Sequence, residues 1–206
     1  MGFHSARLNL VLMFMTKGWT LHFCALALLG AGTVLGQPAF KVRAGNQATP
    51  EGGNVRVLLM QAGGQYFSVQ VPRGYGAQVR YSDQSITFTA GTGSSVITMR
   101  LSTNYPGSLP KMEGLRDMVA ASHPAASLVQ TSPCGTGYGT GLLFELFQPT
   151  AGNVTLRIRE AYLSIEEGSF QFTMSCDQAD YDKARLSFAW LLNSFHSVAQ
   201  PAKKEA

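Results

Sequence analysis

The sequence is poor in charged residues, cysteine and histidine. Charged residues make up 14% of the chain, whereas soluble domains usually carry about 25%. Lysine and arginine together exceed aspartate and glutamate by only four, and they are scattered along the chain. Binding to a nucleic acid needs basic residues gathered on one face. The composition therefore argues against a nucleic-acid-binding protein.

Side chains that bind metals or attack substrates do not form clusters in the sequence. After the first 36 residues the chain retains two histidines, His123 and His196, and neither has a cysteine, histidine or aspartate at ligand spacing. The sequence has no G-x-S-x-G motif, and neither Cys134 nor Cys176 has a histidine nearby. We therefore predict no catalytic residues, no metal site and no cofactor. A catalytic site assembled by folding from distant residues remains an alternative.

The N-terminal region has the pattern of an export signal. Lys17 precedes an apolar run, and small residues follow that run up to Gly36. This order predicts a signal peptide over residues 1–36, with Met13 or Met15 as alternative starts, and a periplasmic or secreted protein. The apolar run approaches the ~20 residues that span a bilayer. An uncleaved anchor is therefore the alternative, and it would be the membrane contact of the chain.

The remaining chain is expected to form one domain. Residues 37–54 are rich in Pro, Gly, Gln and Asn without apolar periodicity, which is typical of a linker. Residues 199–206 are polar and are expected to be a disordered tail. The domain is thus predicted to occupy residues 55–198.

Apolar and polar residues alternate in several short runs of this domain. In the run at 65–72, apolar Phe67 and Val69 share one parity, and the runs at 85–90 and 96–101 repeat the pattern around a Gly-Thr-Gly-Ser-Ser loop. Such alternation is typical of antiparallel strands with one buried face, and the loop is typical of a hairpin. Further extended runs lie at 127–132, 141–148, 154–165 and 169–175.

One helix is predicted between the third and fourth of these runs. Ser108 is placed to cap it, and Met112, Leu115 and Val119 recur at helical spacing. His123 is expected to end the helix, because it precedes a proline.

A second and stronger helical pattern ends the domain. Asp177 or Asp180 is placed to cap it. Its apolar stripe consists of Tyr181, Ala184, Phe188, Leu191, Leu192 and Phe195. The order of strands, helix, strands, helix predicts an α+β fold in which two helices cover a mainly antiparallel sheet.

The stretch SPCGTGYGTG at residues 132–141 has glycine at every second position. Phosphate-binding loops need G-x-x-x-x-G-K-[ST], or G-x-G-x-x-G between a strand and a helix, and this stretch has neither. We predict a tight turn at 135–138, and then a strand whose start passes close to a neighbour. Tyr138, at the tip of the turn, is a candidate partner contact, although packing on its own domain is the stronger interpretation.

Cys134 and Cys176 are a candidate disulfide. An oxidising compartment after export favours the bond. However, if 141–148, 154–165 and 169–175 form a meander, the two cysteines lie some 20 Å apart at ~3.3 Å per residue. A disulfide needs Cα atoms within ~7 Å. The oxidising compartment therefore favours the bond, whereas the expected distance opposes it.

The run at 154–165 carries two arginines and changes its apolar parity. Apolar residues are even-numbered before Arg159 and odd-numbered after Glu160, which predicts a bulge at that point. Arg157 and Arg159 would then lie together on the solvent side, either as a solvated pair or as an anion or partner contact. We treat both as candidate partner contacts.

Three segments resemble the PsbP-like family, which is named after an extrinsic subunit of photosystem II and includes small exported bacterial proteins. They are FSVQVPRGY at 67–75, REAYLSIEEGSFQFTMSC at 159–176, and the closing helix YDKARLSFAWLLNSF at 181–195. The resemblance implies an α/β/α sandwich around an antiparallel sheet and a non-enzymatic role in binding or assembly. None of these segments is catalytic.

Together these observations favour an exported, non-catalytic domain that binds a protein partner in the periplasm or cell envelope. One alternative is a carrier of a small molecule or lipid, with an apolar pocket between sheet and helix. The other is a hydrolase with a dispersed site that includes His123 or His196.

Overall fold

The computed structural model of the chain describes residues 40–50, 52–151 and 154–200. The predicted signal peptide over 1–36 lies outside these residues, as do residues 201–206 of the predicted tail. The first half consists of β1 (Phe40–Ala48), β2 (Asn54–Ala62), β3 (Gln65–Gln70), β4 (Tyr75–Arg80), β5 (Ser85–Ala90) and β6 (Val96–Ser102). The second half consists of α1 (Met112–Ser122), β7 (Ser127–Gly135), β8 (Thr140–Pro149), β9 (Thr155–Ile165), β10 (Gly168–Asp177), the 3-10 turn η2 (Gln178–Asp180), α2 (Tyr181–Ser194) and β11 (His196–Ser197).

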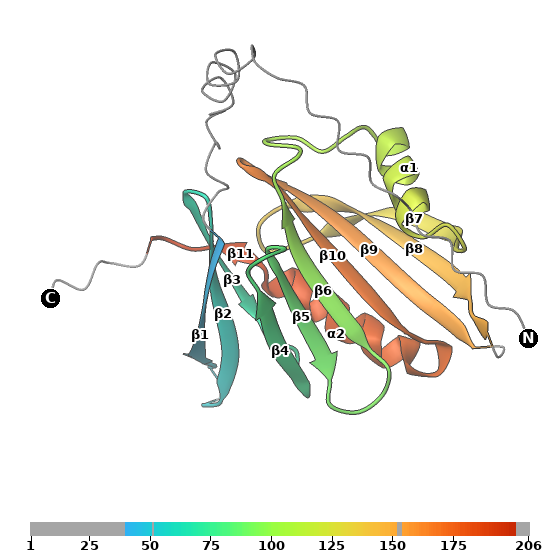
Figure 1. Cartoon of the computed structure of the whole chain (residues 1–206). Helices are drawn as coiled ribbons and strands as arrows, with labels where there is room; N and C mark the ends of the chain where they lie inside the picture. The colour runs from blue at the N-terminus through green and yellow to red at the C-terminus, as the bar shows by residue number, and fades with distance from the viewer. Residues whose placement is uncertain (1–39, 51, 152–153, 201–206) are drawn as a thin grey trace, which may run out of the picture. The chain divides into compact units, whose positions relative to one another are not determined.

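The strands form two antiparallel sheets (Figure 1). One sheet has four strands in the order β1-β2-β3-β11, and the other has seven in the order β4-β5-β6-β10-β9-β8-β7. The predicted meander of β8, β9 and β10 is confirmed, because each pairs with the next in antiparallel register. Strand β10 then returns to pair with β6, which joins the halves of the larger sheet.

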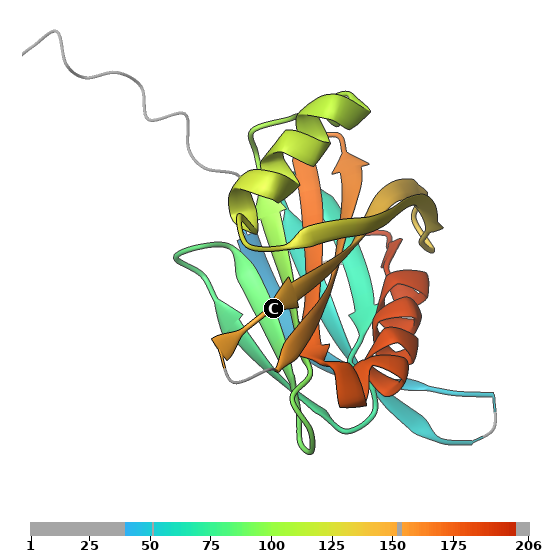
Figure 2. The ribbon, with the colours of Figure 1, turned by 90° about the vertical axis from the view of Figure 1, so that its right-hand side faces the viewer.

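The larger sheet is covered by a helix on each face, which confirms the predicted α+β fold (Figure 2). Alternation along β9 shows this directly. Ala161 and Leu163 belong to the core that contains α2 and the four-stranded sheet, whereas Ile158 and Tyr162 belong to the core beneath α1. Neighbouring side chains of a strand point to opposite faces, so one strand contributes to both cores.

Fully buried phenylalanines join the two sheets and α2. Phe195, directly after α2, stacks on Phe67 of β3 with ring centroids 5.1 Å apart. It also meets Phe170 and Phe172 of β10 edge-on at 5.0 and 5.4 Å. Aromatic pairs at such distances add to the free energy gained from burial alone. The predicted apolar stripe of α2 is therefore the centre of the main core.

The expectation of a linker over 37–54 is wrong for residues 40–48, which are half of its length. Residues 40–48 form β1, which pairs with β2 from Phe40 opposite Ala62 to Ala48 opposite Asn54. Of the side chains of β1, only Phe40 is buried. Because β1 is an edge strand held by backbone hydrogen bonds, its composition remains polar and shows no clear apolar period.

Neither helix has the capping bond that the sequence predicts. Helix α1 starts at Met112 with Lys111 at its N-cap, so Ser108 does not cap it. Asp180 does stand at the N-cap of α2, but it makes no capping bond. Its Oδ2 instead accepts hydrogen bonds from the backbone N and Oγ of Ser94, at 2.6 and 2.8 Å. The Asp180 side chain thus binds a distant segment and does not bind the backbone N–H groups at the start of α2.

The predicted bulge in β9 is also wrong. Register is continuous from β9 to both neighbours, including at Arg159 and Glu160. The change of apolar parity has another cause, because the two faces of β9 are covered by different helices at different points along the strand. The irregularity lies instead in β7, between Leu128 and Gln130.

The glycine-rich stretch forms the predicted turn and close approach. Thr136 N donates to Gly139 O at 2.8 Å and closes the turn. At Gly141, a Cβ atom would lie 2.2 Å from the carbonyl oxygen of Tyr162. Glycine is needed there because the backbones of β8 and β9 leave no room for a side chain.

Replacing Gly141 with alanine is expected to destabilise the domain by about 1–3 kcal/mol, because the added methyl group forces β8 and β9 apart. Urea unfolding measures the loss. Gly139→Ala is the matched control, since a Cβ atom there meets nothing within 4 Å, and it should cost less than about 0.5 kcal/mol. Equal losses in the two variants would contradict the close approach.

Candidate functional site

Arg157 and Arg159 lie on the face of the larger sheet that α2 covers, and they share one acid. Arg157 Nη2 donates to Glu145 Oε1, and Arg157 Nη1 donates to the side chain of Gln178 at 3.3 Å. Its guanidinium carbon also lies 4.2 Å from the ring centroid of Tyr181, a cation–π contact. The Tyr181 hydroxyl donates to the same Glu145 oxygen at 2.6 Å. Arg157 is thus held on several sides by its own domain.

Arg159 is held much more weakly than Arg157. Its Nε lies 4.0 Å from Glu145 Oε2, and its guanidinium makes no hydrogen bond with any described residue. The expectation that the pair faces solvent is wrong, because only 18% and 16% of the side chains of Arg157 and Arg159 are exposed. Tyr181 at the start of α2 lies over Arg157, and a strand pattern cannot reveal such a cover.

Glu145 is the acid between the arginines. Burial alone would raise the pKa of Glu145, but hydrogen bonds from Tyr181 and Arg157 and the charges of both arginines lower it. The carboxylate therefore stays ionised at neutral pH. Two guanidinium groups against one carboxylate leave this cluster with a surplus of one positive charge.

Exposed side chains lie next to this cluster on the same face. Gln130 of β7 pairs with Glu145, and Phe147 of β8 pairs with Arg157. Both side chains are exposed. We call the five residues Gln130, Glu145, Phe147, Arg157 and Arg159 the arginine surface.

Tyr138, the third candidate partner contact, packs on its own domain. Its ring centroid lies 5.5 Å from that of Phe67 and 6.2 Å from that of Phe195, in edge-on geometry in both cases. The ring is partly buried against the main core. The turn aromatic thus contributes to the core, which was the stronger of its two interpretations.

Cys134 and Cys176 are free thiols, so the candidate disulfide is not formed. Cys134 pairs with Gly141, while Cys176 pairs with Arg157, which pairs in turn with Phe147. Gly141 and Phe147 are about six residues, or about 20 Å, apart along β8. Burial raises the pKa of Cys134, and burial with the charges of nearby aspartates raises the pKa of Cys176 to about 11.

A polar cluster beneath α1 was not predicted from the sequence. Glu160 is fully buried, and its carboxylate meets His123 Nε2 at 3.0 Å. Tyr162 donates its hydroxyl to Glu160 at 2.5 Å, and Gln171 donates its amide. The one signal in the sequence was that Glu160 shares the parity of apolar Ile158. The carboxylate is well supplied with donors, as a buried charge requires.

Within the part of the chain that the structure describes, the two histidines of the hydrolase hypothesis make their side-chain hydrogen bonds to a carboxylate and to a backbone carbonyl. His123 faces Glu160, and His196 Nδ1 donates to the carbonyl of Ser194 at 2.8 Å. Neither ring makes a hydrogen bond to a hydroxyl or thiol of a described residue. A carboxylate beside an imidazole can orient it, but nucleophilic catalysis also needs an attacking group within reach.

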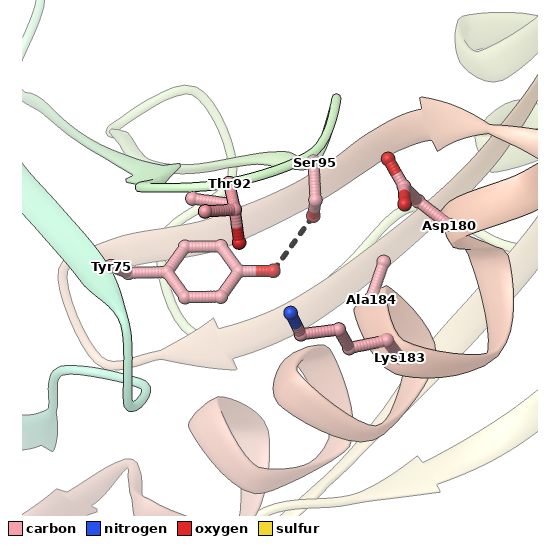
Figure 3. Close-up of a pocket in the computed structure, with 7 residues that line it drawn as sticks. Tyr75, Thr92, Ser95, Asp180, Lys183 and Ala184 are labelled. Carbon is pink, nitrogen blue, oxygen red and sulfur yellow. Dashed lines mark hydrogen bonds between the residues drawn. The ribbon is translucent and has the colours of Figure 1, made fainter.

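A small pocket lies at the start of α2 (Figure 3). The Tyr75 hydroxyl donates to Ser95 Oγ at 2.8 Å, and the Lys183 amine points towards them. The empty volume of the pocket is about 190 Å³, even with the open solvent at its mouth included. Pockets that bind ligands usually enclose ~300–1,000 Å³. The pocket is small and rimmed by hydroxyl groups, so it does not suit a lipid.

Residues 40–50, 52–151 and 154–200 contain no group of three or more His, Cys, Asp or Glu placed to hold a metal ion. No helix within these same ranges is long and apolar enough to cross a membrane.

Solved structures similar to this chain include one from the family that the sequence resembles. It is cyanobacterial PsbP (CyanoP) from Synechocystis sp. PCC 6803, with 13% identity and a TM-score of 0.49, over 83% of this chain and 99% of that one. No family model matches the chain, and no curated protein matches it. At this identity and TM-score, the likeness transfers no residue roles to this chain.

Replacing Glu145 with glutamine is expected to destabilise the domain at neutral pH by about 1 kcal/mol, the usual net value of a hydrogen bond. The pKa of Glu145 is lowered in the folded chain. Its contribution is therefore present above the pKa of the unfolded chain and disappears as the pH falls through the folded-state pKa. Urea unfolding from about pH 7 to about pH 2 should show the difference from the parent closing below about pH 4.

Asp117→Asn is the control for this pH series, because Asp117 is exposed in the middle of α1. It should change the free energy of unfolding by less than about 0.5 kcal/mol at any pH. A Glu145→Gln difference that stays constant down to about pH 2 would refute the ionised role of Glu145.

The thiols are expected to differ in reactivity towards iodoacetamide. In the folded protein Cys134, which is partly buried, should be alkylated slowly, and Cys176, which is buried, should not be alkylated. In urea both should react, without prior reduction. Peptide mass spectrometry distinguishes the sites, and recovery of a Cys134–Cys176 linked peptide from unreduced protein would show that the bond does form.

Proposed function

We propose that this chain is an exported, non-catalytic domain that binds a protein partner in the periplasm or cell envelope. The observation that carries the proposal is strand β7, which forms one edge of the larger sheet. Export is supported by the signal pattern of residues 1–36. The polar clusters around Glu145 and Glu160 favour a non-catalytic role, since both engage carboxylates with partners of their own domain.

Strand β7 has the properties of an edge that pairs with another chain. It runs for nine residues, Ser127–Gly135, none of which is charged. Most of its side chains are exposed, and its apolar Leu128 and Val129 face solvent. Edge strands usually carry charges that prevent pairing with other chains, whereas strands that bind partners present free backbone groups. We infer that β7 receives an extended segment of a partner.

Two features of β7 restrict what can pair with it. The irregularity between Leu128 and Gln130 bends the strand, and Pro133 lacks a backbone N–H. Both features oppose unspecific association along the whole edge. A short partner segment is therefore favoured over continuous stacking of sheets.

The opposite edge of the same sheet offers a matched comparison. Strand β4 is shorter, with six residues, and it ends at the exposed Arg80. Tyr81, just after β4, and Val129 in β7 are each 58% exposed. The two edges thus differ in charge and length, but they offer apolar side chains that are equally accessible.

Site-specific photo-crosslinking in cells that produce the full chain tests this proposal. A photoreactive phenylalanine analogue at position 129 should give a discrete adduct with another protein, identified by mass spectrometry. The same analogue at position 81 should not give this adduct. No adduct from position 129, the same adduct from both positions, or a dimer of this chain alone would count against the proposal.

A further inference from the structure

Arg159 has donor groups that its own domain does not use. A guanidinium group carries five N–H donors and stays charged in proteins. That of Arg159 is mostly buried, yet its single polar contact among the described residues is the 4.0 Å approach to Glu145. Its Nε is enclosed without a hydrogen-bond partner, as is the Nε of Arg157, whereas the terminal nitrogens of Arg159 are not among the enclosed atoms. A mostly buried charge without acceptors is costly, so these terminal nitrogens call for an acceptor from outside the domain.

Glu145 cannot satisfy both arginines. Its Oε1 already accepts from the Tyr181 hydroxyl and from Arg157 Nη2. Its Oε2 lies at salt-bridge range from Arg159 but too far for a hydrogen bond. The surplus positive charge of the arginine surface therefore resides on Arg159, while Arg157 is neutralised.

The position of Arg159 connects it to the edge of the sheet. Arg159 pairs with Glu145, and Glu145 pairs with Gln130 of β7, so one row of side chains runs from the guanidinium to the edge. Gln130 is exposed, and so is Phe147 beside it. Phe147 pairs with Arg157, the neighbour of Arg159 on the same face. Arginine and aromatic side chains are enriched at protein interfaces.

We propose that Arg159 binds an acidic side chain of the protein partner, with Gln130 and Phe147 at the rim of the contact. This inference rests on the proposed function, because it specifies the chemistry of the protein that is proposed to pair with β7. One carboxylate would neutralise the surplus charge. It would also provide the planar pair of acceptors that a guanidinium group binds through two parallel hydrogen bonds.

The test is a titration of the full chain, labelled with ¹⁵N, in which the side-chain Nε–H signal of Arg159 is followed by NMR. The probes are acetyl-Val-Glu-Val-amide and its neutral counterpart acetyl-Val-Gln-Val-amide. The glutamate peptide should shift the signal in a saturable way and bind at least about tenfold more tightly than the glutamine peptide. This comparison uses the unaltered protein, so it does not depend on whether a variant folds.

Variants locate the site. Arg159→Gln should lower the affinity for the glutamate peptide at least about tenfold, and Arg159→Lys should lower it less, because lysine keeps the charge but loses the planar fork. Arg100→Gln is the control. Arg100 is an exposed arginine of β6 that lies 4.0 Å from Asp83, and its removal should leave the affinity unchanged.

Several results would overturn the assignment. They are equal binding of the two peptides, undiminished binding by Arg159→Gln, or saturation by sodium acetate with the same dissociation constant, which would mean an adventitious anion. If position 129 crosslinks to a partner while the glutamate peptide fails to bind, the proposed function stands and the role of Arg159 fails. If the peptide binds at Arg159 but no crosslink forms at position 129, the proposed function fails at the edge strand.

Discussion

The stacking of Phe195 on Phe67 holds the two sheets and α2 together. Phe67 belongs to the four-stranded sheet, and Phe195 follows α2 and also packs on β10 of the seven-stranded sheet. The burial of such a ring stabilises a fold by about 1.5–3 kcal/mol. Because the rings fix α2 on the larger sheet, they also place Tyr181, at the other end of α2, over Arg157.

The clusters around Glu160 and Glu145, on opposite faces of the larger sheet, differ in whether their charges are balanced within the domain. On the α1 face, Glu160 is fully buried and receives donors from His123, Tyr162 and Gln171. That cluster ties α1 to the sheet and leaves its acid fully engaged. On the α2 face, one acid faces two arginines, and the surplus charge lies towards the uncharged edge strand β7. On the α1 face the buried carboxylate has all its partners within the domain. On the α2 face the surplus positive charge has no hydrogen-bond partner among the described residues, so the α2 face is the one suited to binding an acidic group.

Features that belong to a single helix, strand or turn could be predicted from the sequence alone. Alternation located β5 at 85–90 and β6 at 96–101 almost to the residue, and helical spacing identified the buried side of α2. The spacing of glycines located the turn and the close approach at Gly141. These predictions succeed because the burial of one face imposes a period on the element that carries it.

Which helices and strands contact one another could not be predicted from the sequence. Strand β1 is polar and is held in the sheet by backbone pairing with β2, so its side-chain pattern did not predict a strand. Asp180 binds Ser94 from 86 residues away, and His123 meets Glu160 across 37 residues. The parity change at Arg159 could equally mean a bulge or two covered faces, and only the positions of α1 and α2 distinguish them. Such contacts depend on how segments far apart in the sequence pack together. The apolar period of a single helix or strand contains no information about that packing.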